Sequence, residues 1–351
     1  MARPRSILGL LFHLMRLYAR RRPVWTAAAA CLVVAALVWP RHHDAGRGAG
    51  AGLQLAVLHD GFAITHPGDG GHRVIELDRQ GQERRATTVR HGDDPRVVGT
   101  RAGAAVAWQD GQKVRLALVD GDKGLSTWGK SVRQLCEGVA SNDTRFAIGW
   151  LESDDRVWIV HGPVAEGEAE VAEAIELPLP APDAVRSEWC GVASAGDNVT
   201  MFWRDADKLK FGMCTRRRCS GLIATFKLDR RLPIIGFGCV DNACLVATRD
   251  DAGHARVALL TETSKLKWTK PLDASSGAVS ILGVGDRGFV VGQLTRDGAE
   301  VLRFDRNGAA TSLWRDGAAT SAPALAWSSG RLLIARHHGD TLVHETLALA
   351  R

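Results

Sequence analysis

The fold is decided by the stretch 245–335, in which the apolar runs Leu245-Val246-Ala247, Phe289-Val290-Val291 and Leu333-Ile334-Ala335 recur every 44 residues. Similar runs occur four more times towards the N-terminus, at Phe62-Ala63-Ile64, Val106-Ala107-Trp108, Phe146-Ala147-Ile148 and Met201-Phe202-Trp203. The successive intervals are 44, 40, 55, 44, 44 and 44 residues. The long interval contains the Pro-rich stretch 177–185, which indicates an inserted loop. Repetition at a nearly fixed period predicts an architecture of seven repeated units.

Each unit has the same internal order. A first apolar run and a turn precede the central run, and a fourth run such as Leu266-Lys267-Trp268 ends the unit. The third run follows the central run by 8–12 residues, at Val74-Ile75, Val114–Leu116, Val157–Ile159, Leu209–Phe211, Val257–Leu259, Val301–Phe304 and Leu342-Val343. Short strands separated by Gly, Asp and Asn turns predict a four-stranded antiparallel meander.

Meanders repeated radially at this period describe a β-propeller. We therefore predict an all-β, seven-bladed β-propeller of four-stranded antiparallel blades over residues 53–351, with a period of about 44 residues. The last unit stops after its third strand. We expect the N-terminal residues, the Gly-rich linker and Leu53-Gln54-Leu55, to supply the missing strand and close the ring.

The turn from third to fourth strand carries a further pattern of Asp, Gly and Trp. It occurs as Asp120, Gly124 and Trp128, and as Asp305, Gly308 and Trp314, while Asp78 and Gly81 repeat its start and Trp268 its end. This pattern resembles the repeat of the quinoprotein-type (PQQ-repeat) and WD40-like propeller families. The resemblance implies a tryptophan docked between neighbouring blades. A non-enzymatic outer-membrane assembly factor of this repeat type is similar, but it is a lipoprotein with eight blades.

The N-terminus predicts a membrane anchor. Residues 24–39, VWTAAAACLVVAALVW, carry no charge, and Trp25 and Trp39 bracket the run as interfacial aromatic residues do. Arg20, Arg21 and Arg22 stand just before it, which places the N-terminus in the cytoplasm by the positive-inside rule. We predict a short basic cytoplasmic segment (1–23), a transmembrane helix (24–40) and a Gly-rich linker (41–52).

The apolar run is shorter than the roughly 20 residues that span a bilayer. A cleaved signal peptide is therefore the alternative to an anchor. Its nearest small-x-small cleavage site, Ala49-Gly50-Ala51, lies well beyond the apolar run, which favours the uncleaved anchor. In a bacterium, this topology predicts an inner-membrane, single-pass protein whose main domain is periplasmic.

The charge distribution argues against a nucleic-acid partner. The formal net charge is +6, but residues 1–43 hold seven arginines and no acidic residue. The rest of the chain has 38 basic and 39 acidic residues, so it is close to neutral. A nucleic-acid-binding domain needs a basic stripe on the folded domain itself.

Six cysteines follow the anchor, and an even count beyond a membrane span predicts disulfides in an oxidising compartment. Cys214 and Cys219 share one spacing with Cys239 and Cys244, and each pair lies between two strand-like runs. We expect each pair to cross the neck of a hairpin, where facing residues come within disulfide reach. Cys136 in CEGVAS and Cys190 in CGVAS share a context that predicts equivalent places in two repeats. A zinc site is the alternative, although thiolate sites usually use tighter cysteine pairs or include His.

Two further motifs have structural explanations. Gly283–Gly288, GVGDRG, fits G-x-G-x-x-G, but a strand-like run follows it where a dinucleotide site needs a helix, so we predict a turn. His337 and His338 would point to opposite faces of one strand, which prevents them from chelating one ion together. Trp108, Trp150 and Trp203 recur at one strand position and predict packing between blades. We predict no catalytic, metal or cofactor site.

The sequence therefore favours a membrane-anchored extracytoplasmic propeller that binds a protein partner or acts as a scaffold in the cell envelope. The alternative is an enzyme that uses the central channel, either a hydrolase or a quinone- or metal-dependent oxidoreductase. A third hypothesis is a ligand sensor that reports through the short cytoplasmic segment to a partner.

Overall fold

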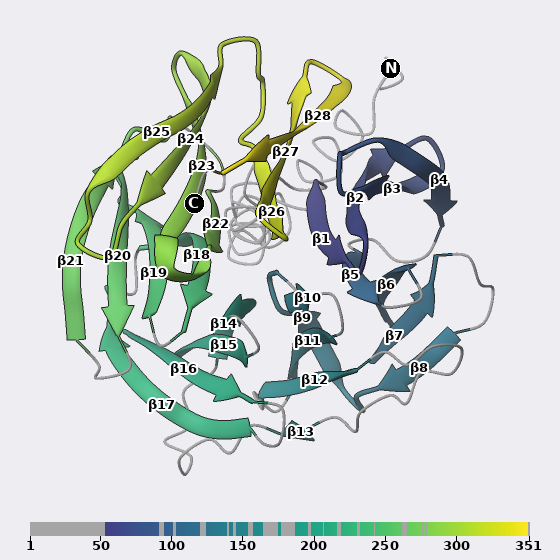
Figure 1. The fold of residues 1–351 in the computed structure, drawn as a ribbon. Coiled ribbons are helices and arrows are strands. Elements are labelled where there is room, and N and C mark those ends of the chain that lie inside the picture. The colour runs from purple at the N-terminus through teal and green to yellow at the C-terminus, as the bar shows by residue number, and fades with distance from the viewer. Residues whose placement is uncertain are drawn as a thin grey trace, which may run out of the picture. The chain divides into compact units, whose positions relative to one another are not determined.

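The computed structural model describes residues 53–90, 95–100, 103–119, 124–138, 140–142, 145–153, 157–163, 175–176, 187–195, 198–205, 207–215, 219–229, 232–241, 243–261, 265–275, 277 and 279–349. Within these residues the strands form seven antiparallel sheets that follow one another around a common centre (Figure 1). In all but the third sheet, each strand pairs only with its neighbours along the chain. The domain is therefore a seven-bladed β-propeller, as the repeat predicts.

The first blade contains β1 (Gln54–Leu58), β2 (Gly61–Gly68), β3 (Gly71–Asp78) and β4 (Glu83–Val89). The second contains β5 (Arg96–Thr100), β6 (Gly103–Asp110), β7 (Lys113–Leu118) and β8 (Gly124–Trp128). The third contains β9 (Val132–Leu135), β10 (Ala140–Asn142), β11 (Arg145–Glu152), β12 (Val157–Pro163) and β13 (Ile175–Glu176). The fourth contains β14 (Ser187–Ala195), β15 (Asn198–Asp205), β16 (Lys208–Cys214) and β17 (Cys219–Lys227).

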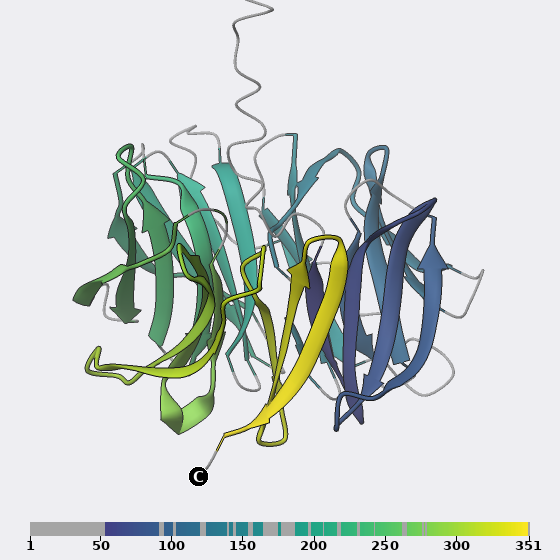
Figure 2. The same ribbon diagram turned by 90° about the horizontal axis from the view of Figure 1, so that it is seen from above.

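The fifth blade contains β18 (Ile234–Val240), β19 (Ala243–Arg249), β20 (Ala255–Thr261) and β21 (Lys265–Leu272). The sixth contains β22 (Ser280–Gly283), β23 (Phe289–Thr295), β24 (Gly298–Phe304) and β25 (Ala310–Asp316), with a short 3-10 turn, Gly285–Arg287, between its first two strands. The seventh contains β26 (Ala324–Ser328), β27 (Arg331–His338) and β28 (Thr341–Ala348). Figure 2 shows the blades edge-on.

The seven central apolar runs all lie in the second strand of a blade, in β2, β6, β11, β15, β19, β23 and β27. These strands have a neighbouring blade on each face, so both faces of the strand are buried and the run is continuous rather than alternating. Phe62, Ala63 and Ile64 of β2 are each 0% exposed. Trp150 and Trp203 are also fully buried between blades, as predicted.

Ring closure differs from the sequence-based expectation. Leu53–Leu55 does not complete the seventh blade, because β1 is the innermost strand of the first blade and pairs with β2. The seventh blade has three strands among the described residues, and it closes the ring by packing. Leu333 and Ala335 of β27 share one buried cluster with Phe62 and Ile64 of β2. The apolar side chains of the N-terminal run fill the space between the two blades, which explains why it forms an inner strand.

The third blade has an interrupted inner strand. β9 and β10 both pair with β11, and Glu137 between them forms a bridge to Gly191 of the fourth blade. There the Glu137 amide donates to the Cys190 carbonyl over 2.8 Å, and the Val192 amide donates to the Glu137 carbonyl over 2.8 Å. The interruption of the inner strand at Glu137 therefore adds backbone hydrogen bonds between the third and fourth blades.

The predicted cytoplasmic segment (1–23), transmembrane helix (24–40) and linker (41–52) lie outside the described residues, as do Arg20–Arg22, Trp25 and Trp39. Within the described ranges, the structure contains no helix with the length and apolarity needed to cross a bilayer.

Candidate functional surfaces and the blade seams

Long polar side chains at the ends of second strands hold successive blades together. Arg204, at the end of β15, donates to the carbonyls of Asp229 (2.5 Å) and Leu232 (2.8 Å) in the connection to the fifth blade. Arg249 of β19 donates to the Ala274 carbonyl over 3.1 Å, in the connection to the sixth blade. Both guanidinium groups satisfy carbonyls that no strand partner reaches. These arginines therefore tie each blade to the connection that leads to the next blade.

A cluster of titratable groups joins the sixth and seventh blades. Asp316, at the end of β25, accepts hydrogen bonds from Arg336 Nε (2.6 Å) and His338 Nε2 (2.7 Å). Arg336 also pairs with Glu345 over 2.8 Å, and its guanidinium lies 4.6 Å from the centre of the Trp314 ring. The Arg336 side chain is 7% exposed and that of Asp316 is 13% exposed. A nearly buried arginine is thus matched by two carboxylates and an aromatic face.

The electrostatics of this cluster keep Asp316 ionised. Burial raises the pKa of Asp316, but hydrogen bonds from His338, the Ala318 amide and Arg336 outweigh burial and lower the pKa to about 2. Each oxygen of the carboxylate already accepts a hydrogen bond from the chain. The arrangement stabilises the seam, because every charge in it has a partner.

Histidines gather where the seventh blade meets the first. The rings of His66 and His337 lie 6.2 Å apart, edge to face, whereas His338 turns to Asp316 of the sixth blade. The two adjacent histidines therefore face opposite neighbours, as predicted. The pKa of His66 is lowered, chiefly by burial and further by His337, Arg73 and His72. Within the described ranges, no three His, Cys, Asp or Glu residues are arranged to hold a metal ion.

The structure brings each predicted cysteine pair to disulfide distance. The sulfur atoms are 2.01 Å apart for Cys136–Cys190, 2.02 Å for Cys214–Cys219 and 2.20 Å for Cys239–Cys244. The last two pairs are directly opposite residues of the β16–β17 and β18–β19 hairpins.

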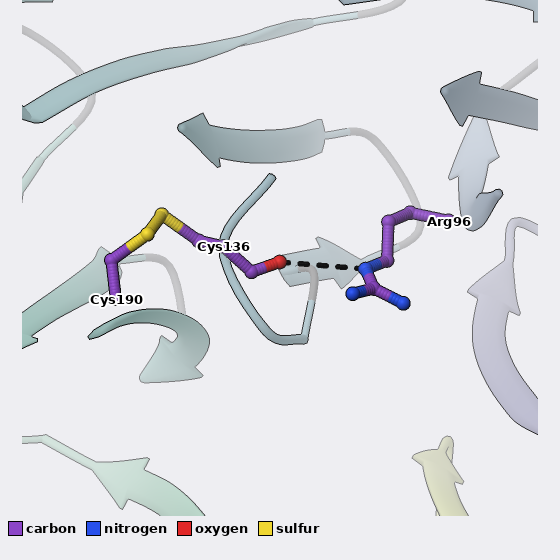
Figure 3. Close-up of a disulfide and its surroundings, with 3 residues drawn as sticks. All are labelled: Arg96, Cys136 and Cys190. Carbon is purple, nitrogen blue, oxygen red and sulfur yellow. Dashed lines mark hydrogen bonds between the residues drawn. A yellow bond between two sulfur atoms is a disulfide. The ribbon is translucent and has the colours of Figure 1, made fainter. Parts of the chain in front are cut away.

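Cys136–Cys190 joins two blades rather than two strands of one hairpin (Figure 3). Cys136 follows β9 in the third blade, and Cys190 lies in β14 of the fourth. Arg96 of β5 donates from Nε to the Cys136 carbonyl over 3.4 Å (Figure 3). One short segment therefore connects the second, third and fourth blades.

The structure also explains the remaining motifs. Gly283 ends β22, and residues 284–288 form the turn to β23, which starts at Phe289 as the predicted strand does. Trp268 of β21 donates from Nε1 to the Arg306 carbonyl of the sixth blade over 3.1 Å. Its ring stacks on Phe304 and lies against Gly308, where an added Cβ would approach the ring to 3.0 Å. Trp268 therefore docks between neighbouring blades.

The sequence analysis did not identify the arginines that bind across the boundaries between blades. Arg204 and Arg336 directly follow the central apolar runs, and Arg249 follows one residue later. A polar residue at the end of a buried strand is a visible signal, although only the structure identifies its carbonyl or carboxylate partner. Asp316 could not be recognised, because its partners Arg336 and His338 lie in the next blade.

Comparison with known proteins gives a fold likeness only. No family model and no curated protein matches the chain. Among solved structures, the WD40 domain of coronin from Toxoplasma gondii is similar with a TM-score of 0.53 and 10% identity, over 87% of this chain and 82% of that chain. The chain shares the β-propeller fold of that domain.

Two further solved structures have similar scores. The β-propeller domain of Cps50 (Swd1) from Myceliophteria thermophila has a TM-score of 0.52 and 15% identity, over 86% of this chain and 97% of that chain. A chain in the crystal structure of the Mitotic Checkpoint Complex has a TM-score of 0.52 and 13% identity, over 86% of this chain and 88% of that chain. At identities this low, the structural likeness shows a shared fold and nothing more.

Proposed function

We propose that this protein is a membrane-anchored, extracytoplasmic β-propeller that binds a protein partner as a scaffold module of the cell envelope. The observation that carries the proposal is the way the ring uses its charged groups. Arg204, Arg249 and Arg336 bind carbonyls and carboxylates between blades and so stiffen the ring. A rigid ring presents its turns and outer strands in fixed positions, which lowers the entropic cost of recognising a partner.

The similar proteins support a binding role by analogy. One neighbour was solved as part of the Mitotic Checkpoint Complex, so a propeller of this fold serves in an assembly there. Fold likeness alone never fixes a function, and the surface of this chain must carry the specificity. The resemblance to quinoprotein-type repeats is part of the same proposal, and the docking of Trp268 against Gly308 supports it.

The sequence and the cysteine geometry support an oxidising compartment outside the cytoplasm. Residues 24–40 with Arg20–Arg22 fit a single-pass anchor with the N-terminus inside. Three cysteine pairs at bonding distance fit an oxidising compartment, which in a bacterium is the periplasm. We place the protein in the inner membrane with its propeller on the periplasmic side.

Counting free thiols in the host tests this placement. Cells are denatured with and without reductant, and a polyethylene-glycol maleimide then adds mass at each free thiol. The proposal predicts one adduct per chain before reduction, at Cys31, and seven after it, because the chain has seven cysteines and six are paired. Seven adducts before reduction would contradict the oxidising compartment. No adduct before and six after would show that the segment containing Cys31 is removed.

Photocrosslinking tests the binding role. A photoreactive residue replaces an exposed turn residue of the full-length chain in its host, at Asp69, Gln80, Asp251 or Asn307 in four separate variants. The four turns sample both ends of the ring. We expect one and the same protein to be crosslinked from the positions of one end. Absence of any protein adduct from all four positions would contradict a partner on the ring ends.

A further inference from the structure

We propose that β21, the outer strand of the fifth blade, binds an acidic, extended segment of another protein, which adds to the blade as a fifth strand. The proposal names the partner chemistry of the binding role above and therefore rests on it. β21 pairs with β20, and in the part of the chain that the structure describes its other edge faces no strand. An edge of this kind offers free backbone amides and carbonyls to an incoming peptide.

The charges on β21 are unlike those of the outer strands β4 and β25. Lys265, Lys267 and Lys270 are all exposed, and they form no ion pair within the described residues. By contrast, Arg84 of β4 pairs with Asp60, and Arg315 of β25 pairs with Glu300. Three lysines within six residues, and no carboxylate in the strand, give β21 a positive charge that no ion pair among the described residues offsets.

An exposed apolar side chain stands between these lysines. Leu266 is 58% exposed, and it is the one large hydrophobic side chain that the described residues leave exposed. Lysines on a sheet edge ordinarily keep other strands away, and a solvent-exposed leucine among them works against that role. The combination fits an edge that excludes most strands and accepts one with complementary charge and an apolar residue opposite Leu266.

The edge is held in place before any partner arrives. Trp268 anchors β21 to the sixth blade through its hydrogen bond to the Arg306 carbonyl and its stacking on Phe304, with ring centres 6.0 Å apart. The stem of Lys270 lies over Gly308 of the same blade, where an added Cβ would meet its Cε at 3.0 Å. A fixed strand loses little conformational freedom on binding, so the ordering cost falls mainly on the incoming segment.

The positive charge of β21 also disfavours its pairing with β21 of a second copy of the chain. Two copies of β21 side by side would bring three lysines against three lysines, and like charges on facing strands destabilise a pair. Lys265 and Lys270 lie opposite Thr261 and Val257, which share one face of β20, so glutamate or aspartate on that face of an incoming strand would meet both lysines. The chemistry of β21 therefore points to an acidic strand of a different protein.

The test places a photocrosslinking residue at Leu266 in the full-length chain and exposes cells of the host to light. We expect an adduct with another protein, and mass spectrometry should locate the crosslink in an acidic, extended segment. The variant K265E/K267E/K270E should reduce the adduct by roughly tenfold or more, because three attractive surface pairs become repulsive. The matched control is K113E/K208E/K227E, which reverses three other exposed lysines and makes the same change in net charge.

Several outcomes would overturn the proposal. Equal adduct yields from both triple variants, an adduct in a segment without acidic residues, an adduct with a second copy of this chain, or no protein adduct each exclude it. Unchanged melting temperature of both variants shows that the ring is intact. Crosslinks from the turn positions without any from Leu266 would leave the binding function standing and remove β21 as its site.

Discussion

The cysteine pairs give a quantitative prediction, because the three bonds close loops of very different length. Cys136 and Cys190 are separated by 54 residues, whereas the other two pairs are each separated by 5 residues. A crosslink stabilises mainly by restricting the unfolded chain, and the effect grows with the logarithm of the loop length. That relation gives about 4 kcal/mol for Cys136–Cys190 and about 2 kcal/mol for each hairpin pair.

The perturbation is pairwise replacement by alanine in the full-length protein in detergent. Urea unfolding followed by tryptophan fluorescence gives the loss of stability for C136A/C190A, C214A/C219A and C239A/C244A. We expect C136A/C190A to cost about 2 kcal/mol more than either hairpin variant. The inter-blade bond closes the longest loop and joins two blades that the neighbouring hydrogen bonds already hold close.

A reduced series separates the crosslink from lost packing. In the presence of reductant the parent protein also lacks the bonds, so the differences between parent and variants should shrink to the small packing contribution of the sulfur atoms. A cost for C136A/C190A no larger than that of the hairpin variants would refute the loop-length reasoning. Differences that persist undiminished under reductant would show that the sulfurs act by packing and not as crosslinks.

Three further predictions follow from the seams. R336M should lower the unfolding free energy by about 3 kcal/mol, because Asp316 keeps its charge while its side chain is only 13% exposed. The double variant D316N/R336M should lose less than the sum of the losses of R336M and D316N. Losses that simply add would contradict the pairing. Stability should fall as the pH drops below about 6.5, because burial lowers the pKa of His66 and the unfolded chain binds the proton first. H66Q should make this decline of the urea midpoint shallower, and an unchanged decline would contradict the role of His66. A second loss should occur between pH 3.8 and about 2, as the ionised Asp316 is protonated first in the unfolded chain. G99A should prevent folding, because an added Cβ would lie 1.6 Å from the Val57 carbonyl oxygen. In the control G111A the added Cβ faces open space, so this variant should lose only about 1 kcal/mol of unfolding free energy for its positive φ. A folded G99A protein in thermal melts would contradict the close contact of β5 with β1.

The periodic part of the fold could be predicted from sequence because its cause is local. Each second strand is buried on both faces, so its apolar run is visible without knowledge of any partner, as at Phe289-Val290-Val291. The hairpin cysteine pairs could be predicted for the same reason, since Cys239 and Cys244 lie on either side of one turn. The shared context of Cys136 and Cys190 also set these two cysteines apart from the hairpin pairs, and the structure brings them together although they are 54 residues apart.

Features that depend on contacts between blades could not be predicted. Leu53–Leu55 has an alternating apolar pattern that suits an outer or an inner strand, and only packing against the seventh blade decides for the inner one. Asp316 finds Arg336 and His338 across a seam that no local pattern marks. The transmembrane helix predicted at 24–40 stays a prediction, because it lies outside the described residues.

Native mass spectrometry of the full-length protein, gently extracted from the membranes of its own host, tests the central claim most directly. The account predicts the uncleaved chain with three disulfides, bound to a second protein at a fixed stoichiometry. Added mass of a metal ion or small cofactor without a protein partner would contradict the scaffold role and favour the enzyme alternative. A bare chain that starts after residue 51 would contradict both the anchor and the stable complex.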